Sequence, residues 1–194
     1  MKVLVVGSGG REHALCWKIG HAPTWCMPGN AGTVQVAFQA EGSSGDMSEI
    51  LSFAQKNNIE LVVIGPEDAL EQGLADQLRR KNILVFGPSR RAAKLEWSKV
   101  YAKRFMKKYG IPTADFRVAR TVNGVRGAVE KLGPIEAVLK ADGLAYGKGV
   151  HVVQSEQELD RALSEFFWFR RFGDASNKLL LKSVLEGLRC RCMF

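Results

Sequence analysis

The sequence predicts an α/β protein whose first part is a doubly wound parallel sheet and whose second part mixes short strands with helices. Continuous apolar runs, typical of strands buried on both faces, occur at residues 2–6, 60–64 and 83–86 and alternate with helical patterns. After Gly110-Ile111-Pro112 the pattern changes to short strands around single helices. We therefore expect two domains, at residues 1–100 and 101–194.

The first strand, at residues 2–6, is followed at once by Gly7-Ser8-Gly9-Gly10 and by helical spacing up to residue 19. A strand, a glycine turn and a helix form an anion site at the helix N-terminus. As a dinucleotide fingerprint the segment is poor, because Glu12 stands at the third glycine position and no clean second strand ends in an acid about 20 residues later. A mononucleotide or a sugar phosphate suits this loop better than NAD.

Further along the first domain, the spacing predicts helices over residues 47–56 and 70–81 and one long helix over residues 90–109. Glu67 ends the strand at residues 60–64, at the sheet edge where ligands bind in such folds. A turn glutamate without a ligand is the alternative. Cys16 and Trp17 are expected in the core, and His13 at the base of the glycine loop. In the second domain we expect strands at 115–119, 137–141 and 179–181 and helices at 123–132 and 156–166.

Residues 138–153 predict a strand, a glycine-rich loop and a second strand. Gly143, Gly147 and Gly149 let backbone amides approach an anion, and Lys140 and Lys148 beside them favour a polyphosphate. The loop is not a Walker A motif, since neither Ser nor Thr follows the lysine and a strand pattern follows where a helix should begin. A lid over phosphates is one interpretation, and a surface hairpin with solvated lysines is the other.

One window of the chain has a larger excess of basic residues than the formal net charge of +8 of the whole chain. Between Asp76 and Lys108 there are eleven Lys or Arg residues against two acids. Such a stripe serves nucleic acid or small phosphorylated ligands, or forms a solvated helix face. Nucleic acid is not expected as a partner, because the aromatic side chains in the window fall mostly where a helix or strand would bury them.

Composition and the cysteines predict a cytoplasmic protein. The apolar run near the N-terminus is ended by Gly7, and no apolar run approaches the roughly 20 residues that cross a bilayer, so neither a signal peptide nor a membrane span is expected. The four cysteines lack CxxC spacing and nearby paired histidines, which favours free thiols over a zinc site.

Seven stretches, in order along the chain, resemble glycinamide ribonucleotide synthetase, also called phosphoribosylamine–glycine ligase, an ATP-grasp enzyme of purine biosynthesis. GSGGREHAL is specific to this ligase, whereas the second glycine loop is shared by related ATP-grasp enzymes. The resemblance implies a Rossmann-like substrate-binding domain followed by an incomplete ATP-grasp domain. The stretches are VLVVGSGGREHAL (3–15), PGNAGT (28–33), VVIGPE (62–67), FGPS (86–89), LEWSKVYAKRFM (95–106), GIPTA (110–114) and KADGLAYGKGV (140–150).

The resemblance also implies a reaction and its site. ATP phosphorylates the carboxylate of glycine, and the amine of 5-phosphoribosylamine attacks the acyl phosphate to form an amide. Such a site supplies cations and alignment rather than a protein nucleophile, so no residue is singled out as catalytic. The residues implied for phosphoribosylamine are Ser8, Gly9, Gly10, Arg11, Asn30, Gly32 and Glu67, and those implied for ATP are Lys99, Lys140, Gly143, Gly147, Lys148, Gly149 and Glu186.

The sequence departs from the family at several places. Tyr146 and Trp97 stand where small residues are usual, and Lys182-Ser183 replaces the acidic pair of the segment that holds adenine and ribose. Family members are more than twice as long, and the ligands of the implied Mg²⁺ are expected after Phe194 rather than within this chain. Little or no turnover is therefore expected from this chain alone.

The sequence leaves two alternatives to a ligase. The first is a non-catalytic module that binds a sugar phosphate or nucleotide, or pairs with another chain. The second is an NAD-dependent oxidoreductase, which the incomplete fingerprint disfavours.

Overall fold

The computed structural model describes residues 1–183 except 133–135, 145–148, 170 and 172. The chain divides into two compact units, Met1–Lys94 and Leu95–Phe194, each of which is described by itself. The domain division expected after residue 100 falls inside a helix that belongs to the second unit. Among the described helices, none combines the length and the hydrophobicity of a membrane span.

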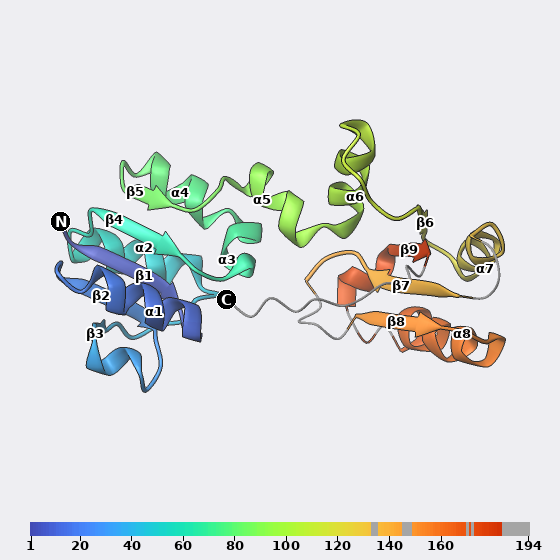
Figure 1. The fold of residues 1–194 in the computed structure, drawn as a ribbon. Helices are drawn as coiled ribbons and strands as arrows, with labels where there is room; N and C mark the ends of the chain where they lie inside the picture. The colour runs from blue at the N-terminus through green and yellow to red at the C-terminus, as the bar shows by residue number, and fades with distance from the viewer. Residues whose placement is uncertain (133–135, 145–148, 170, 172, 184–194) are drawn as a thin grey trace. The chain divides into compact units, whose positions relative to one another are not determined.

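The first unit is built on a five-stranded sheet with the order β3-β2-β1-β4-β5, in which every paired strand runs parallel to its neighbour (Figure 1). All five residues of β1 (Val3–Gly7) are buried, as expected of a central strand. The other elements are α1 (Gly10–Ile19), β2 (Thr24–Pro28), η1 (Thr33–Gln35), β3 (Phe38–Gln39), α2 (Met47–Lys56), β4 (Leu61–Ile64), α3 (Glu67–Gln72), α4 (Leu74–Arg80), β5 (Leu84–Phe86) and α5 (Arg90–Trp97), which continues into the second unit.

Helices cover both faces of this sheet, as the doubly wound prediction requires. One face packs Leu4, Val6 and Val62 against α2, α3 and α4. The other packs Val3 and Val5 against α1, through Cys16 and its neighbours. Alternate residues of one strand thus enter different cores, which is why β1 reads as an unbroken apolar run.

Two predictions for the first unit were wrong, and one strand was not predicted. The single helix expected over residues 70–81 is two helices, because Gly73, with φ of +92°, adopts the left-handed conformation that ends α3. The strand β2 was missed, because five residues ending in proline give little periodicity. Trp17 is 69% exposed, since Cys16 and not Trp17 faces the sheet.

A buried carboxylate closes the turn between β1 and α1. Glu12 is 3% exposed, and its Oε2 accepts a hydrogen bond of 2.6 Å from the Gly9 N–H. Its side chain fills the space left by three glycines that lack a Cβ: a methyl group at Gly7 or Gly65 would lie 2.7 Å from Glu12 Cγ. Glycines in the loops after β1 and β4 therefore make room for a side chain of α1.

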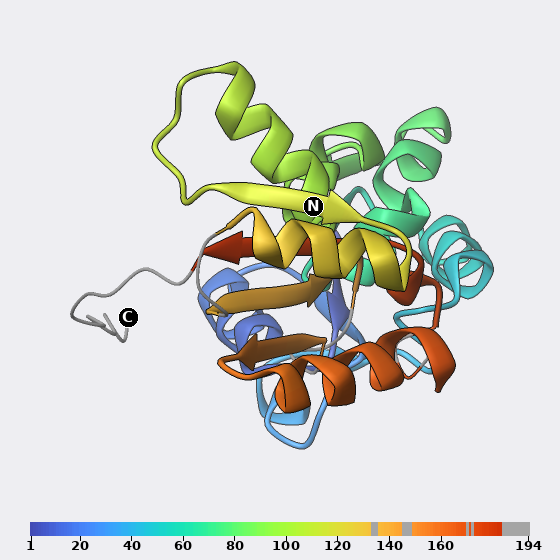
Figure 2. The same cartoon turned by 90° about the vertical axis from the view of Figure 1, so that its right-hand side faces the viewer.

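The second unit is built on a four-stranded antiparallel sheet with the order β6-β9-β7-β8. Seen in Figure 2, the helices α7 and α8 lie on the same side of this sheet. The elements are α6 (Lys99–Lys108), β6 (Phe116–Ala119), α7 (Val122–Glu130), β7 (Ala137–Ala141), β8 (Val150–Val153), α8 (Glu156–Leu163), the π-helix η2 (Ser164–Trp168), η3 (Gly173–Asn177) and β9 (Leu179–Ser183).

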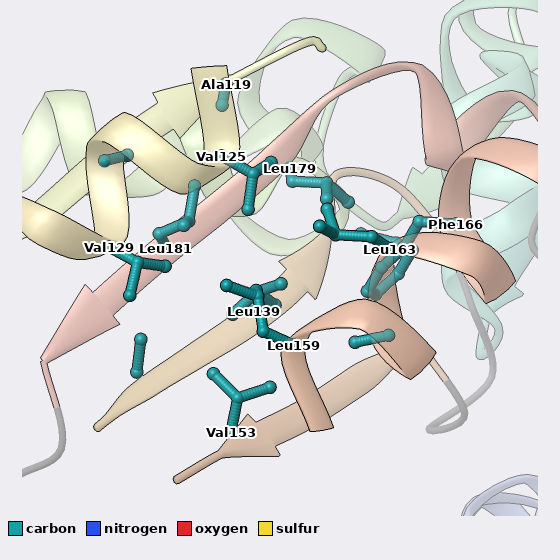
Figure 3. Packing of buried hydrophobic residues seen from close by; sticks show 14 of the residues in the cluster. Ala119, Val125, Val129, Leu139, Val153, Leu159, Leu163, Phe166, Leu179 and Leu181 are labelled. Atoms are coloured by element: carbon teal, nitrogen blue, oxygen red, sulfur yellow. The ribbon is translucent and has the colours of Figure 1, made fainter. Parts of the chain in front are cut away.

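The core of the second unit lies between the sheet and these two helices (Figure 3). Leu139, Leu179 and Leu181 of the central strands are fully buried there, against Val125 of α7 and Leu159 of α8. The opposite face of the sheet carries Lys140 and Lys182, because side chains alternate along each strand.

The prediction of one long helix over residues 90–109 was also wrong. The segment is two helices, α5 and α6, separated at Ser98. Ser98 has extended backbone angles, and its hydroxyl accepts a hydrogen bond from the Tyr101 N–H, so it caps α6. Helical spacing on both sides of the cap hid the break.

We predict that Gly65→Ala destabilises the first unit. The new methyl group would overlap the Glu12 carboxylate, and the buried side chain has no solvent to move into, so the free energy of unfolding should fall by about 1–3 kcal/mol. Urea unfolding monitored by circular dichroism measures it. Gly10→Ala is the control, because a Cβ there meets nothing within 4 Å, and its change should stay within about 0.5 kcal/mol. Equal stability of the two variants would contradict the packing of Glu12 against Gly65.

Candidate functional site

The carboxyl edge of the first sheet brings the predicted substrate residues together. Ser8, Gly9 and Gly10 follow β1, and all three are exposed at the start of α1. The segment containing Asn30 and Gly32 follows β2, and Glu67 begins α3 directly beyond β4. Because β2, β1 and β4 are neighbours and parallel, these three loops meet at one edge.

Asn30 fastens the two glycine-containing loops to each other. Its Nδ2 donates to the carbonyl oxygens of Ser8, at 2.8 Å, and of Gly9, at 3.3 Å. Its Oδ1 accepts from the N–H groups of Gly32, at 2.7 Å, and of Thr33, at 3.1 Å. One side chain thus saturates four backbone groups, which fixes the loop at the start of α1 while leaving its outer surface open.

Two further side chains complete this edge. Arg11 and Glu67 approach each other with Nη2 and Oε2 3.4 Å apart, and both remain substantially exposed. The imidazole of His13 lies against Gly32, where a Cβ would be 2.7 Å from the ring. His13 therefore packs against the loop that follows β2. The role of Glu12 was missed, although its position three residues after the Gly9 cap is a capping signal.

In the second unit, a buried carboxylate fixes the start of α6 against the turn that follows β7. The side chain of Asp142 is 6% exposed. Its Oδ1 accepts from the Ser98 hydroxyl and from the Val100 N–H, both at 3.0 Å, and its Oδ2 accepts from Lys178 Nζ at 2.9 Å. Asp142 was missed as well. The available signal is an acid at the start of the glycine loop, beside the glycines and lysines on which the sequence prediction rests.

This arrangement places Lys99 at the same turn. Lys99 is the first residue of α6, and its Nζ donates to the carbonyl oxygen of Gly143 at 2.8 Å. Gly143 has φ of +131°, a conformation that favours glycine. Gly149, just before β8, is buried. Gly147, Lys148 and Glu186, together with Tyr146, lie outside the described residues.

A cavity of about 220 Å³ opens beside Lys99, and we call it the lysine pocket. Lys99 and Lys103 come from α6, one helical turn apart, Lys140 from β7 and Lys182 from β9. Lys99 and Lys140 are both among the residues that the family resemblance implies for ATP, and the structure brings them to one cavity. The residues that line it are Leu95, Glu96, Lys99, Ala102, Lys103, Met106, Lys140, Leu180 and Lys182.

Burial disfavours the charged forms of Lys99, Lys103 and Lys140, and repulsion by neighbouring lysines adds to this effect on the pKa of Lys103 and of Lys140. The pKa of Lys99 is lowered by burial, against the opposing attraction of Asp142 and Glu96. The pKa of Lys140 is lowered by burial and then by the charges of Lys182 and Lys99. The pKa of Lys103 is lowered in the same way, by burial, Lys182 and Lys140, and is raised by Asp115. A bound anion would relieve this repulsion.

Comparison with known proteins identifies the family. The N-domain profile of phosphoribosylglycinamide synthetase matches residues 1–96, and the profile of its ATP-grasp (A) domain matches residues 97–193. This chain belongs to the phosphoribosylglycinamide synthetase family. The resemblance drawn from the seven sequence stretches and the predicted fold class are both confirmed.

Curated relatives of this synthetase family match over nearly the whole chain. Phosphoribosylamine–glycine ligase from Phenylobacterium zucineum is 43% identical over 192 residues, which cover 96% of this chain and 45% of the relative. The ligase from Escherichia coli K12 is 41% identical over 195 residues, with the same coverage. The chain thus spans a little under half the length of these relatives.

Solved structures agree with the family profiles. The crystal structure of phosphoribosylamine–glycine ligase from Thermotoga maritima matches with a TM-score of 0.78 and 35% identity, covering 97% of this chain and 45% of that one. The biotin carboxylase domain of 2-oxoglutarate carboxylase from Hydrogenobacter thermophilus, solved with magnesium ADP, also gives a TM-score of 0.78. At 22% identity that likeness shows the fold alone.

Magnesium, which the family resemblance implies, does not fit the lysine pocket. Mg²⁺ is held in proteins by carboxylates and by oxygens of the substrate, and Glu96 is the one carboxylate that lines this pocket among the described residues. Within the same described ranges, no group of three or more His, Cys, Asp or Glu side chains could hold a metal ion. No chemical step is therefore assigned to a metal here.

We predict that Asp142→Ala costs the second unit about 3 kcal/mol of unfolding free energy. The substitution removes the acceptor of the buried Ser98 hydroxyl and Val100 N–H and the partner of Lys178. Chemical denaturation of the variant measures the loss. Asp160→Ala is the matched control, because its ion pair with Arg126 is exposed and should contribute less than about 1 kcal/mol. Similar losses in the two variants would show that Asp142 does not hold the start of α6.

Proposed function

We propose that this chain forms the phosphoribosylamine-binding and ATP-phosphate-binding part of an ATP-dependent phosphoribosylamine–glycine ligase, which makes glycinamide ribonucleotide for purine biosynthesis. The observation that carries the proposal is the lysine pocket, in a chain whose two family profiles match nearly from end to end. A half-buried cluster of ammonium groups suits the phosphate chain of ATP.

In the proposed reaction, a carboxylate oxygen of glycine attacks the γ-phosphorus of ATP, and ADP leaves. The amine nitrogen of phosphoribosylamine then attacks the carbonyl carbon of glycyl phosphate, inorganic phosphate leaves, and the nitrogen loses a proton. The oxygens of the transferring phosphoryl group are stabilised by cations, a role that Lys99 and Lys140 would fill. No protein nucleophile is needed.

The first unit would bind phosphoribosylamine at the edge that Asn30 organises. The exposed residues at the start of α1 suit the 5-phosphate, since a helix N-terminus favours an anion. Arg11 adds a cation at the same edge. Glu67 offers an acceptor for the ribose hydroxyls or for the amine. These roles rest on the matched family motifs and on the exposure of the loop.

Separate ligand titrations test the two halves of this proposal. We expect ribose 5-phosphate to bind the chain and Asn30→Ala to weaken it about tenfold or more, because the loop loses the side chain that fixes both of its segments. ATP binding by the same variant should be unchanged. Asn57→Ala, which removes a similar hydrogen bond to the Phe53 carbonyl oxygen away from this edge, serves as the control. Isothermal titration calorimetry measures both ligands.

ATP binding tests the lysine pocket in the same way. Lys140→Met should weaken ATP about tenfold to a hundredfold, because one charge-assisted contact is lost, and should leave ribose 5-phosphate binding unchanged. Lys131→Met, at an exposed lysine outside the pocket, is the matched control. Binding of ribose 5-phosphate without any binding of ATP would overturn the ligase assignment and point to a sugar-phosphate module.

A further inference from the structure

The lysine pocket holds four ammonium groups that converge from three elements. Lys99 and Lys103 are four residues apart on α6 and share one face of that helix. Lys140 pairs with Leu180 in the sheet, while Lys182 pairs with Val138, two residues before Lys140. Lys140 and Lys182 are therefore diagonal neighbours on the same face of adjacent strands, within reach of a common ligand.

The described residues leave these charges largely uncompensated. Lys99 donates to the carbonyl oxygen of Gly143, and Lys103 donates to the Thr113 hydroxyl and the Ala114 carbonyl oxygen. All of these acceptors are neutral. Neither Lys140 nor Lys182 has a hydrogen bond or an ion pair to another described residue. Within the described part of the chain, none of these four ammonium groups is therefore hydrogen-bonded to a carboxylate.

Three carboxylates act on these lysines, and none of them neutralises the group. Glu96 lines the pocket from α5 and is itself exposed. Asp142 attracts Lys99 but is hydrogen-bonded to Ser98, Val100 and Lys178. Asp115 acts on Lys103 from the end of the chain segment before β6. Four cations against one lining carboxylate leave a strongly positive cavity.

We propose that the lysine pocket binds a polyphosphate chain as the metal-free anion, with the four ammonium groups in the place that a divalent cation usually takes beside a triphosphate. The inference rests on the proposed function, since it concerns the same pocket, and it specifies which ionic form of the ligand binds. A magnesium complex carries two fewer negative charges than the free anion and would bring a further cation among four ammonium groups. Electrostatics therefore favours the free anion.

The size and the walls of the pocket agree with this ligand. About 220 Å³ is below the 300–1,000 Å³ range of sites that enclose a whole drug-sized molecule, so the cavity suits the phosphate chain rather than an entire nucleotide. Ala102, Met106 and Leu180 provide an apolar wall, which limits solvent screening of the ion pairs. Inorganic tripolyphosphate is accordingly the simplest probe.

The test is calorimetric titration of the full chain with tripolyphosphate and with ATP, at constant ionic strength, in EDTA and in excess Mg²⁺. We expect both ligands to bind in EDTA at least as tightly as in Mg²⁺, and excess Mg²⁺ to weaken tripolyphosphate at least tenfold by competing for the anion. Lys182→Met should weaken metal-free binding about tenfold, whereas Lys131→Met should leave it unchanged. Lys103→Met, read out in the same way, gives an independent result if Lys182→Met fails to fold.

The outcomes separate this inference from the proposed function. Binding of ATP that requires Mg²⁺ overturns the metal-free inference and leaves the nucleotide site standing. Absence of binding in both buffers overturns both. Equal metal-free binding by the wild-type chain and by folded Lys182→Met and Lys103→Met variants also overturns the inference, because the charge of the pocket would then not determine affinity.

Discussion

The carboxylate of Asp142 joins the three elements that build the lysine pocket. It lies just beyond β7, takes two hydrogen bonds from the start of α6, and pairs with Lys178 immediately before β9. Ser98 and Val100 are both buried, so without this acceptor their donors would lose hydrogen bonds out of reach of water. The position of Lys99 beside Lys140 and Lys182 therefore depends on one side chain that does not itself line the cavity.

The first unit uses a buried acid differently. Glu12 receives one hydrogen bond, from Gly9, and its second oxygen has no donor among the described residues. The Glu12 side chain occupies space that is open because three neighbouring residues are glycines. A Cβ at Gly7, Gly9 or Gly65 would collide with it. At Asp142 the neighbouring Gly143 is needed instead for its positive φ. Glycines that look alike in the two loops thus serve two purposes, room for a buried carboxylate and an unusual backbone angle.

Local signals explain how much of the structure the sequence could predict. The strand, glycine turn and helix at the N-terminus were recognised because neighbouring residues determine them. The breaks at Gly73 and Ser98 were not, because each lies between segments with the same helical spacing. The strand β2 owes its existence to pairing with β1 across the sheet, which no local pattern records.

In the candidate sites, too, features determined by neighbouring residues could be predicted, and features determined by distant contacts could not. Loop residues such as Asn30 could be matched to a motif, and the structure then showed which backbone groups Asn30 holds. The convergence of Lys182 with Lys140 could not be predicted, because it follows from the register of β9 against β7. The hydrogen bonds of Asp142 could not be predicted either, because its partners Ser98 and Lys178 are distant in sequence.

The basic window between Asp76 and Lys108 shows why a count of charges does not locate a ligand. Arg79 donates a hydrogen bond to the carbonyl oxygen of Gly87, and Arg90 donates one to the carbonyl oxygen of Glu71. These exposed cations therefore pair with backbone carbonyl groups at a turn and at a helix end. Solvent screens such groups, and they retain little attraction for an anion. Lys99 and Lys103 belong to the same window but line a cavity with apolar walls, where screening is weak and repulsion from Lys140 and Lys182 persists. The environment of each cation, rather than the net charge of +8, therefore determines where a polyphosphate is attracted.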